Sequence, residues 1–193
     1  MKINDIKNVS DIYTFMEENI LYGWIWNDGV NHINDMNDFR LKYRTMNLQD
    51  ILNNKVGTCI EQVWLMKNLM DKIGVKSKMF CARMYEDENF NDLKAKERMH
   101  CFLLYYINDN VYQIEHPNFE RKGFYEYESE AATIYKITKI YEDMMRQEYE
   151  KKNLTEPLEG FKRKVTEFYE VMPGLSYKEF NLYINSLDKK KVM

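Results

Sequence analysis

Hydrophobic residues recur every three or four positions in several stretches of the chain, which is the pattern of helices that bury one face. One stretch follows Ser10, which is expected to cap the helix at its N-terminus. Another follows Ser129, and a third starts at Ser176 with the Ser-x-x-Glu pattern of a capping box. The pattern therefore predicts helices at both ends of the chain.

The clearest helical pattern lies in the middle of the chain and begins at Thr58. A short helix capped by Asn47 is expected just before it and leads into Gly57. Gly74 suits the residue that follows a helix, because glycine readily adopts a left-handed conformation. The apolar stripe of this central helix consists of Ile60, Val63, Trp64, Met70 and Ile73.

The apolar period falls to two after the central helix, as in strands that bury one face. Val75 to Tyr85 is expected to be a strand, and a polar loop follows at residues 87–92. His100 to Ile107 and Val111 to Glu115 are expected to form a hairpin around Asn108-Asp109-Asn110. This order predicts an α+β fold in which the central helix packs on an antiparallel sheet.

Length and composition fit one domain over residues 1–193, with a core of about residues 45–130 and terminal helices packed on it. The chain has 193 residues, and 45% of them are hydrophobic. Its net charge of -3 gives no reason to expect nucleic acid as a partner. We expect no membrane span, since no apolar run approaches about 20 residues, and no signal peptide, since the N-terminus has no apolar core. Three cysteines without framework spacing favour free thiols and a cytoplasmic location.

Cys59 has the surroundings of a reactive thiol. It stands at the start of the central helix, after a glycine that permits a sharp entry turn. A helix N-terminus favours the thiolate, which is the nucleophilic form of cysteine. The backbone N–H of Cys59 would also point towards an oxyanion formed beside its sulfur. The alternative is a small buried residue without chemistry.

His100 is the candidate base for this nucleophile, although a lone histidine on an apolar face is more often a core or surface residue. It begins a strand whose alternation places Phe102 and Leu104 on its own face. Cys59, Cys81, Cys101 and His100 could be counted as a zinc set, but their spacing lacks a CxxC or HxxxH motif. We therefore expect neither a metal nor a cofactor.

A third member of the site follows from the register of the expected hairpin. A two-residue turn at Asn108-Asp109 or at Asp109-Asn110 places Glu115 on the His100 face, and the first option sets it diagonal to His100. A three-residue loop would bring His116 there instead, because a slip of one residue exchanges the faces. A carboxylate is better suited to holding an imidazole, so Glu115 is favoured over His116.

The order of these groups resembles the transglutaminase-like, papain-related superfamily, and more narrowly its small bacterial and phage members. In that order a Gly-x-Cys opens a helix, a histidine lies on a strand, and an acid lies on the next strand. The similarity spans roughly residues 10 to 185. Its segments are Leu21-Tyr22-Gly23-Trp24-Ile25, Gly57-Thr58-Cys59-Ile60-Glu61-Gln62-Val63, His100-Cys101-Phe102-Leu103, Tyr112-Gln113-Ile114-Glu115-His116, Gly123-Phe124-Tyr125-Glu126-Tyr127 and Met172-Pro173-Gly174-Leu175-Ser176 with Glu179-Phe180.

The resemblance implies acyl transfer on peptide, isopeptide or glutamine-type amides of a protein or peptide substrate, through a thioester on Cys59. Hydrolysis, transfer and deamidation stay open, as does the oligomeric state. Two residues depart from the family pattern: Ile60 stands where tryptophan is frequent, and Glu115 where aspartate is usual. Trp24 and Gln62 are further candidates for binding the substrate or its oxyanion. The alternative function is a non-catalytic protein-binding module that keeps the fold.

Overall fold

An antiparallel sheet forms the centre of the structure. The computed structural model describes residues 1–86, 97–117, 119–151 and 160–190. In these residues the sheet has five strands in the order β7-β6-β5-β4-β8, and every neighbouring pair is antiparallel. The strands are β4 (Ser77–Tyr85), β5 (Glu97–Ile107), β6 (Asn110–Glu115), β7 (Gly123–Tyr127) and β8 (Lys162–Phe168).

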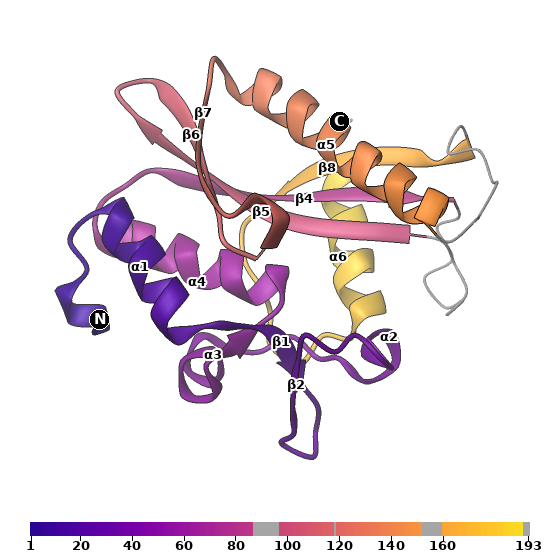
Figure 1. The fold of residues 1–193 in the computed structure, drawn as a ribbon, viewed down its shortest axis with the longest axis horizontal. Coiled ribbons are helices and arrows are strands. Elements are labelled where there is room, and N and C mark those ends of the chain that lie inside the picture. Colours follow the sequence, from indigo (N-terminus) through magenta and orange to yellow (C-terminus); the bar gives the residue numbers. More distant parts are fainter. Residues whose placement is uncertain (87–96, 118, 152–159, 191–193) are drawn as a thin grey trace.

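Helices cover both faces of this sheet (Figure 1). On one face lie α1 (Val9–Asn19), α4 (Cys59–Lys72) and α6 (Tyr177–Lys190), and on the other lies α5 (Glu130–Lys151). The expected α+β class is confirmed. In the described part of the chain, no helix combines the length and the apolar composition that a membrane crossing requires.

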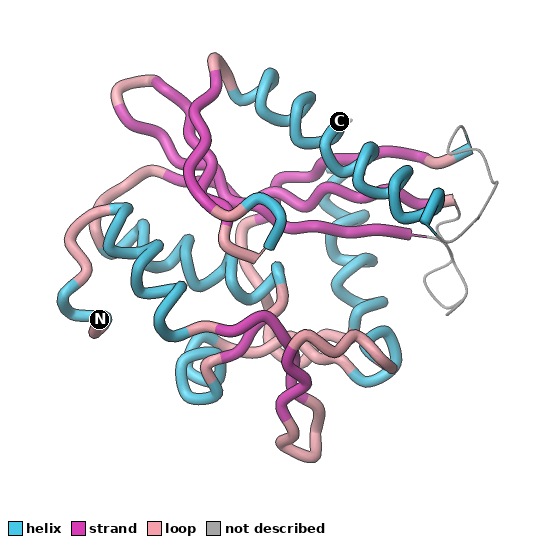
Figure 2. Tube along the Cα trace, in the orientation of Figure 1, coloured by secondary structure: helices cyan, strands magenta, loops and turns pink. Residues whose placement is uncertain are grey.

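The remaining elements are short, and they include a second, smaller sheet that lies beyond α1 and α4, away from the central sheet (Figure 2). This second sheet has the order β2-β1-β3 in the described residues. Its strands are β1 (Leu21–Ile25), β2 (Asn31–Ile33) and β3 (Val56–Gly57). The short helices are η1 (Ile3–Asp5), α2 (Phe39–Lys42), α3 (Leu48–Asn54) and η2 (Phe119–Arg121), of which η2 follows β6.

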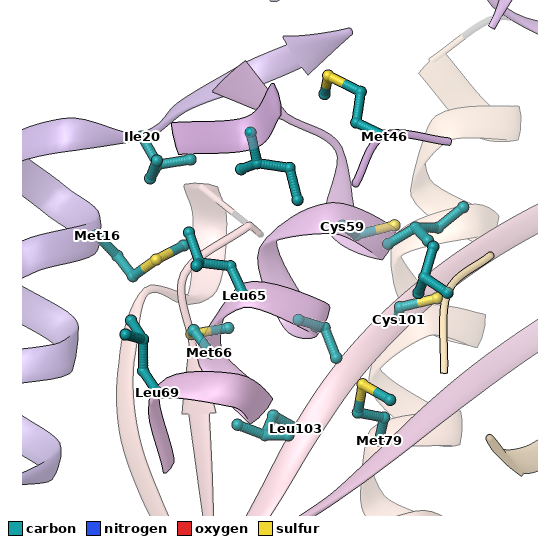
Figure 3. Close-up of a cluster of buried hydrophobic side chains, with 14 of the residues drawn as sticks. Met16, Ile20, Met46, Cys59, Leu65, Met66, Leu69, Met79, Cys101 and Leu103 are labelled. Carbon is teal, nitrogen blue, oxygen red and sulfur yellow. The ribbon is translucent and has the colours of Figure 1, made fainter. Parts of the chain in front are cut away.

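Two hydrophobic clusters hold the layers together. The larger one lies between the central sheet and the helices α1, α4 and α6, and Figure 3 shows the part of it around α4. The smaller one lies between the sheet and α5. Its buried members include Phe80, Phe102, Leu104, Ile137 and Tyr141.

The central helix forms as its sequence predicts. Thr58 is the N-cap, and its hydroxyl accepts a hydrogen bond from the backbone N–H of Ile60. Gly74 follows the last turn with a φ of +74°, in the left-handed region that glycine adopts readily. Steric crowding, and not the expected sharp turn, is the reason that glycine is required at position 57. A Cβ added there would lie 2.8 Å from the Cβ of Glu61, so a side chain does not fit.

The hairpin of β5 and β6 has the first of the two predicted turns. Asn108 and Asp109 have φ values of 49° and 67°, which is the left-handed pair of a two-residue type I′ turn. Ile107 therefore pairs with Asn110, and the last pair of the ladder is Leu103 with Ile114.

Several local predictions need correction. Asn8, not Ser10, caps α1, since its side chain accepts from the N–H of Asp11. β5 begins at Glu97, so His100 lies inside the strand and not at its start. The two edge strands β7 and β8 were not predicted. β7 has only five residues, and the charged residues of β8 hide its alternation. The predicted polar loop lies outside the described residues.

Candidate active site

Cys59 is the first residue of α4 and lies directly after the N-cap Thr58. Only 5% of the residue is exposed. The first N–H groups of a helix have no partners within it, so they face the sulfur with their partial positive charge.

Glu61 fixes this helix end from within the core. Its carboxylate accepts hydrogen bonds from the N–H and the hydroxyl of Thr58 and, at 2.5 Å, from the hydroxyl of Tyr43. Burial raises the pKa of Glu61, although these hydrogen bonds oppose the rise. The residue is fully buried, so its role is to hold the turn that carries Cys59.

His100 lies on β5 with its ring directed towards α5. Its centroid is 4.7 Å from that of Tyr141 on α5. Its Nε2 lies 3.2 Å from each carboxylate oxygen of Glu115. Its side chain also lies close enough to the Cys59 thiol for each group to shift the pKa of the other. Because Nε2 faces Glu115, Nδ1 is the ring nitrogen left for the thiol.

The pKa values of the pair shift in opposite directions. Burial alone would lower the pKa of His100, but the charge of Glu115 and the contact with Cys59 raise it to about 10. The pKa of Cys59 lies well below its usual value, because the neighbouring Cys101 and then His100 favour the ionised sulfur more than burial opposes it. The two shifts together favour a thiolate on Cys59 paired with an imidazolium on His100.

Glu115 is held by side chains from two layers. It is fully buried, and it accepts hydrogen bonds from Gln113 Nε2 at 2.8 Å and from the Tyr141 hydroxyl at 3.3 Å. Gln113 in turn accepts a hydrogen bond from the Tyr127 hydroxyl at 3.0 Å. This network keeps the carboxylate directed at His100, and it confirms the predicted contact between the two residues.

The nucleophile and the base come from opposite sides of the sheet and meet where β5 and β6 separate. Cys59 belongs to the cluster on the α4 side, whereas His100 shares its face with Phe102 on the α5 side. The pairing of β5 with β6 ends at Leu103. Beyond that point the backbone N–H of Cys101 lies close enough to Cys59 to favour its ionised form. The opened ladder is thus part of the site.

A cavity of about 170 Å³ lies beside Cys59. Residues of β1, α2, α4, β5 and α6 or their flanks form its wall. Its polar members that were not predicted as site residues include Tyr22, Arg40, Glu97, Arg98 and Tyr177. Tyr22 carried one usable signal, because it belongs to a segment of the family resemblance. The full lining is Tyr22, Met36, Phe39, Arg40, Thr58, Cys59, Ile60, Glu97, Arg98, Met99 and Tyr177.

Arg40 and Glu97 connect the short helix α2 to β5 at this cavity. The Arg40 guanidinium lies 3.5 Å from the Glu97 carboxylate and 5.6 Å from the centre of the Tyr177 ring. The Glu97 side chain is 6% exposed and that of Arg40 is 28% exposed. Burial raises the pKa of Glu97, while Arg40 opposes the rise. These contacts bring the start of α6 to the nucleophile.

Trp24 and Gln62 lie away from this cavity. Trp24 is fully buried, and its ring stacks on His32 at 4.0 Å. His32 is half-buried in this stack. Gln62 Nε2 donates to the Gly57 carbonyl at 2.8 Å, and its Oε1 lies 2.5 Å from Nδ1 of His116. Both amide ends of Gln62 therefore serve the structure around α4.

All three cysteines are free thiols, and Cys81 and Cys101 lie in the core as expected. Within the described ranges, no group of three or more histidine, cysteine or acidic side chains is placed to hold a metal ion. Searches of family models, curated proteins and solved structures find no match to this chain.

Proposed function

We propose that this chain is a cysteine-dependent hydrolase or acyltransferase that acts on amide bonds of a protein or peptide through a thioester. The observation that carries the proposal is the unbroken series of contacts from Cys59 through His100 to Glu115. A buried thiol of purely structural use needs no imidazolium beside it, and an imidazolium in the core needs a counter-ion.

The reaction follows from the ionised pair. The Cys59 thiolate attacks the amide carbonyl, and the N–H groups at the start of α4 stabilise the oxyanion. The His100 imidazolium gives its proton to the leaving nitrogen, which departs as the C–N bond breaks and leaves a thioester. Neutral His100 then takes a proton from water or from an amine, which attacks the thioester and regenerates the thiolate.

Glu115 supports this cycle through His100. Its carboxylate stabilises the imidazolium and holds the ring with Nδ1 towards the sulfur. Since Glu115 is fully buried, it does not touch the substrate.

The arrangement agrees with what the resemblance to transglutaminase-like proteins implies. A central helix carries the cysteine at its N-terminus, and the sheet on which it packs carries the histidine and the acid on adjacent strands. We therefore propose a transglutaminase-like, cysteine-proteinase type of fold. The order of elements and the contacts among the three residues support this assignment.

The test uses the intact chain and peptide amides under reducing conditions. A library of glutamine-containing and isopeptide-linked peptides is incubated with hydroxylamine, and mass spectrometry follows hydroxamate formation, ammonia release and chain cleavage. We expect one of these products with the wild type and none with Cys59→Ala. Cys81→Ala is the matched control, because Cys81 is also a buried free thiol but lacks the His100 contact, and it should keep full activity.

The proposal is overturned if Cys59 alkylates no faster than a model thiol at pH 6 to 7. A thiol of that kind would make the chain a binding module that keeps the fold without chemistry.

A further inference from the structure

A second thiol lies against the nucleophile. Cys101 on β5 is fully buried, and its side chain lies next to that of Cys59 in the same hydrophobic cluster. Figure 3 shows the two residues as neighbours, one at the first turn of α4 and the other on the strand beneath it. The contact is between groups far apart in the sequence, so it depends on the packing of α4 on β5.

The position of Cys101 follows from the alternation of the strand. His100 and Cys101 are consecutive, so their side chains leave β5 on opposite faces. His100 shares the α5 face with Phe102, and Cys101 lies in the cluster on the α4 side. Both side chains nevertheless reach Cys59, because β6 has left β5 at this point. His100 and Cys101 thus approach the nucleophile from two sides.

Cys101 has one proton and two sulfur neighbours. Besides Cys59 it contacts Cys81, its paired residue on β4. An S–H group is a weak donor to a neutral acceptor, but a hydrogen bond to an ionised acceptor is about twice as strong. The Cys59 thiolate is therefore the better acceptor of the Cys101 proton.

Burial and the neighbouring thiols keep that proton on Cys101. Burial first, and then the hydrogen bond with Cys59, raise the pKa of Cys101 well above its usual value. Cys101 therefore keeps its proton more readily than Cys59 does. The same logic operates in Cys-x-x-Cys motifs, where one cysteine at a helix start is ionised beside a second thiol.

We propose that the thiol of Cys101 donates a hydrogen bond to the Cys59 thiolate and that this bond helps to keep the nucleophile ionised and directed at the cavity. The inference deepens the proposed function and rests on it, because Cys59 is a nucleophile only under that proposal. Cys101 would act together with its own backbone N–H and with His100, so the sulfur has donors on both faces of β5.

The experiment measures the alkylation of Cys59 by iodoacetamide against pH, in the intact reduced chain, with each cysteine peptide identified by mass spectrometry. Cys101→Ala and Cys101→Ser are compared because they differ only by a hydroxyl donor. Cys81→Ala is the matched control for loss of a buried strand thiol. Thermal unfolding of each variant reports on folding.

We expect the pH midpoint of Cys59 alkylation to rise in Cys101→Ala, so that the rate at pH 6 falls roughly tenfold, as for one unit of pKa. The plateau at high pH should stay the same. Cys101→Ser should restore the wild-type midpoint, and Cys81→Ala should leave it unchanged.

Two results overturn the inference. One is a Cys101→Ala profile equal to that of Cys81→Ala, and the other is a serine variant as impaired as the alanine variant, which would assign the effect to packing. If the alanine variant fails to fold, Cys101→Val and Cys101→Thr supply the same contrast, since they have nearly the same shape and differ by one hydroxyl.

Alkylation requires no amide substrate, so the two proposals fail separately. A shifted midpoint in a chain without amide activity would support the Cys101 contact and count against the enzyme. Activity that depends on Cys59, with an unshifted midpoint, would support the enzyme and overturn the role of Cys101.

Discussion

Two histidines lie near the end of β6, the half-buried His100 and the buried His116, and their surroundings shift their pKa values in opposite directions. His100 faces Glu115 and Cys59, and its pKa is raised to about 10. His116 is 3% exposed and lies between Gln62 and Glu17. Burial, and then the charge of Lys122, lower the pKa of His116 to about 4.

The comparison teaches that burial does not decide the charge of a histidine by itself. Burial disfavours the imidazolium at both positions. At His100 a fully buried carboxylate and a thiolate outweigh that cost. At His116 Glu17 also favours the charged form but does not outweigh burial and Lys122. A one-residue change of register would have brought His116, in place of Glu115, onto the His100 face.

The largest expected difference between the two sites is in the reactivity of Cys59. His100→Ala should lower the alkylation rate of Cys59 at pH 6 by roughly a hundredfold, as for about two units of pKa. His116→Gln should change it by less than about twofold, because His116 faces Gln62 and not the sulfur. Peptide-resolved alkylation measures both, and equal effects would remove the distinction between the sites.

Glu115→Gln tests what makes the sites differ. The glutamine side chain carries no negative charge to stabilise the imidazolium, so the pKa of His100 should fall. Turnover of the amide substrate should then drop by roughly a thousandfold or more. The titration of the His100 ring, followed by NMR of labelled histidine, is the direct measurement. Titration of His100 at its old midpoint in this variant would show that Glu115 does not set its charge.

The interaction of His100 with Glu115 should also contribute to the stability of the fold. We expect His100→Ala to destabilise it by about 3 kcal/mol, because the buried Glu115 carboxylate loses its cationic partner. In a Glu115→Gln background the same change should cost about 1 kcal/mol. Urea unfolding of the four chains measures the difference. Strictly additive costs would mean that the two side chains stabilise the fold independently.

The smallest effect concerns acid stability at His116. A histidine with a lowered pKa takes up its proton more readily in the unfolded chain, so stability is complete above pH 6.5 and falls as pH drops towards 4. Between pH 7 and pH 5 this amounts to about 2 kcal/mol, or roughly 1.4 kcal/mol per unit over about 1.5 units. Urea unfolding of His116→Gln should show less of this loss than the wild type, whereas an identical loss would place its origin elsewhere.

The sequence predicts those parts of the site that depend on local backbone geometry. The start of α4 follows from an N-cap and an apolar stripe, and the contact of Glu115 with His100 follows from a two-residue turn at Asn108. These are short-range consequences of backbone geometry, so pattern alone can predict them.

The remaining parts depend on packing between distant elements. Nothing in the pattern around Cys101 distinguishes it from a core thiol, and its contact with Cys59 arises only when α4 docks on β5. Arg40 and Tyr177 reach the cavity from α2 and α6, which are distant in sequence from each other and from Cys59. Trp24 shows the converse. It stands two positions after Tyr22, which lines the cavity, but its own side chain lies in the core.

The separation of β5 from β6 also determines when the site can form during folding. The hairpin around Asn108 closes locally, on the microsecond scale of isolated hairpins. Cys59 and His100 approach from opposite layers, so their contact requires α4 on one face and Tyr141 of α5 on the other. Rapid alkylation of Cys59 at pH 6 should therefore appear late in refolding, after most of the secondary structure has formed. At pH 6 the Cys59 thiol should react slowly in a partly folded chain and rapidly once both layers have docked.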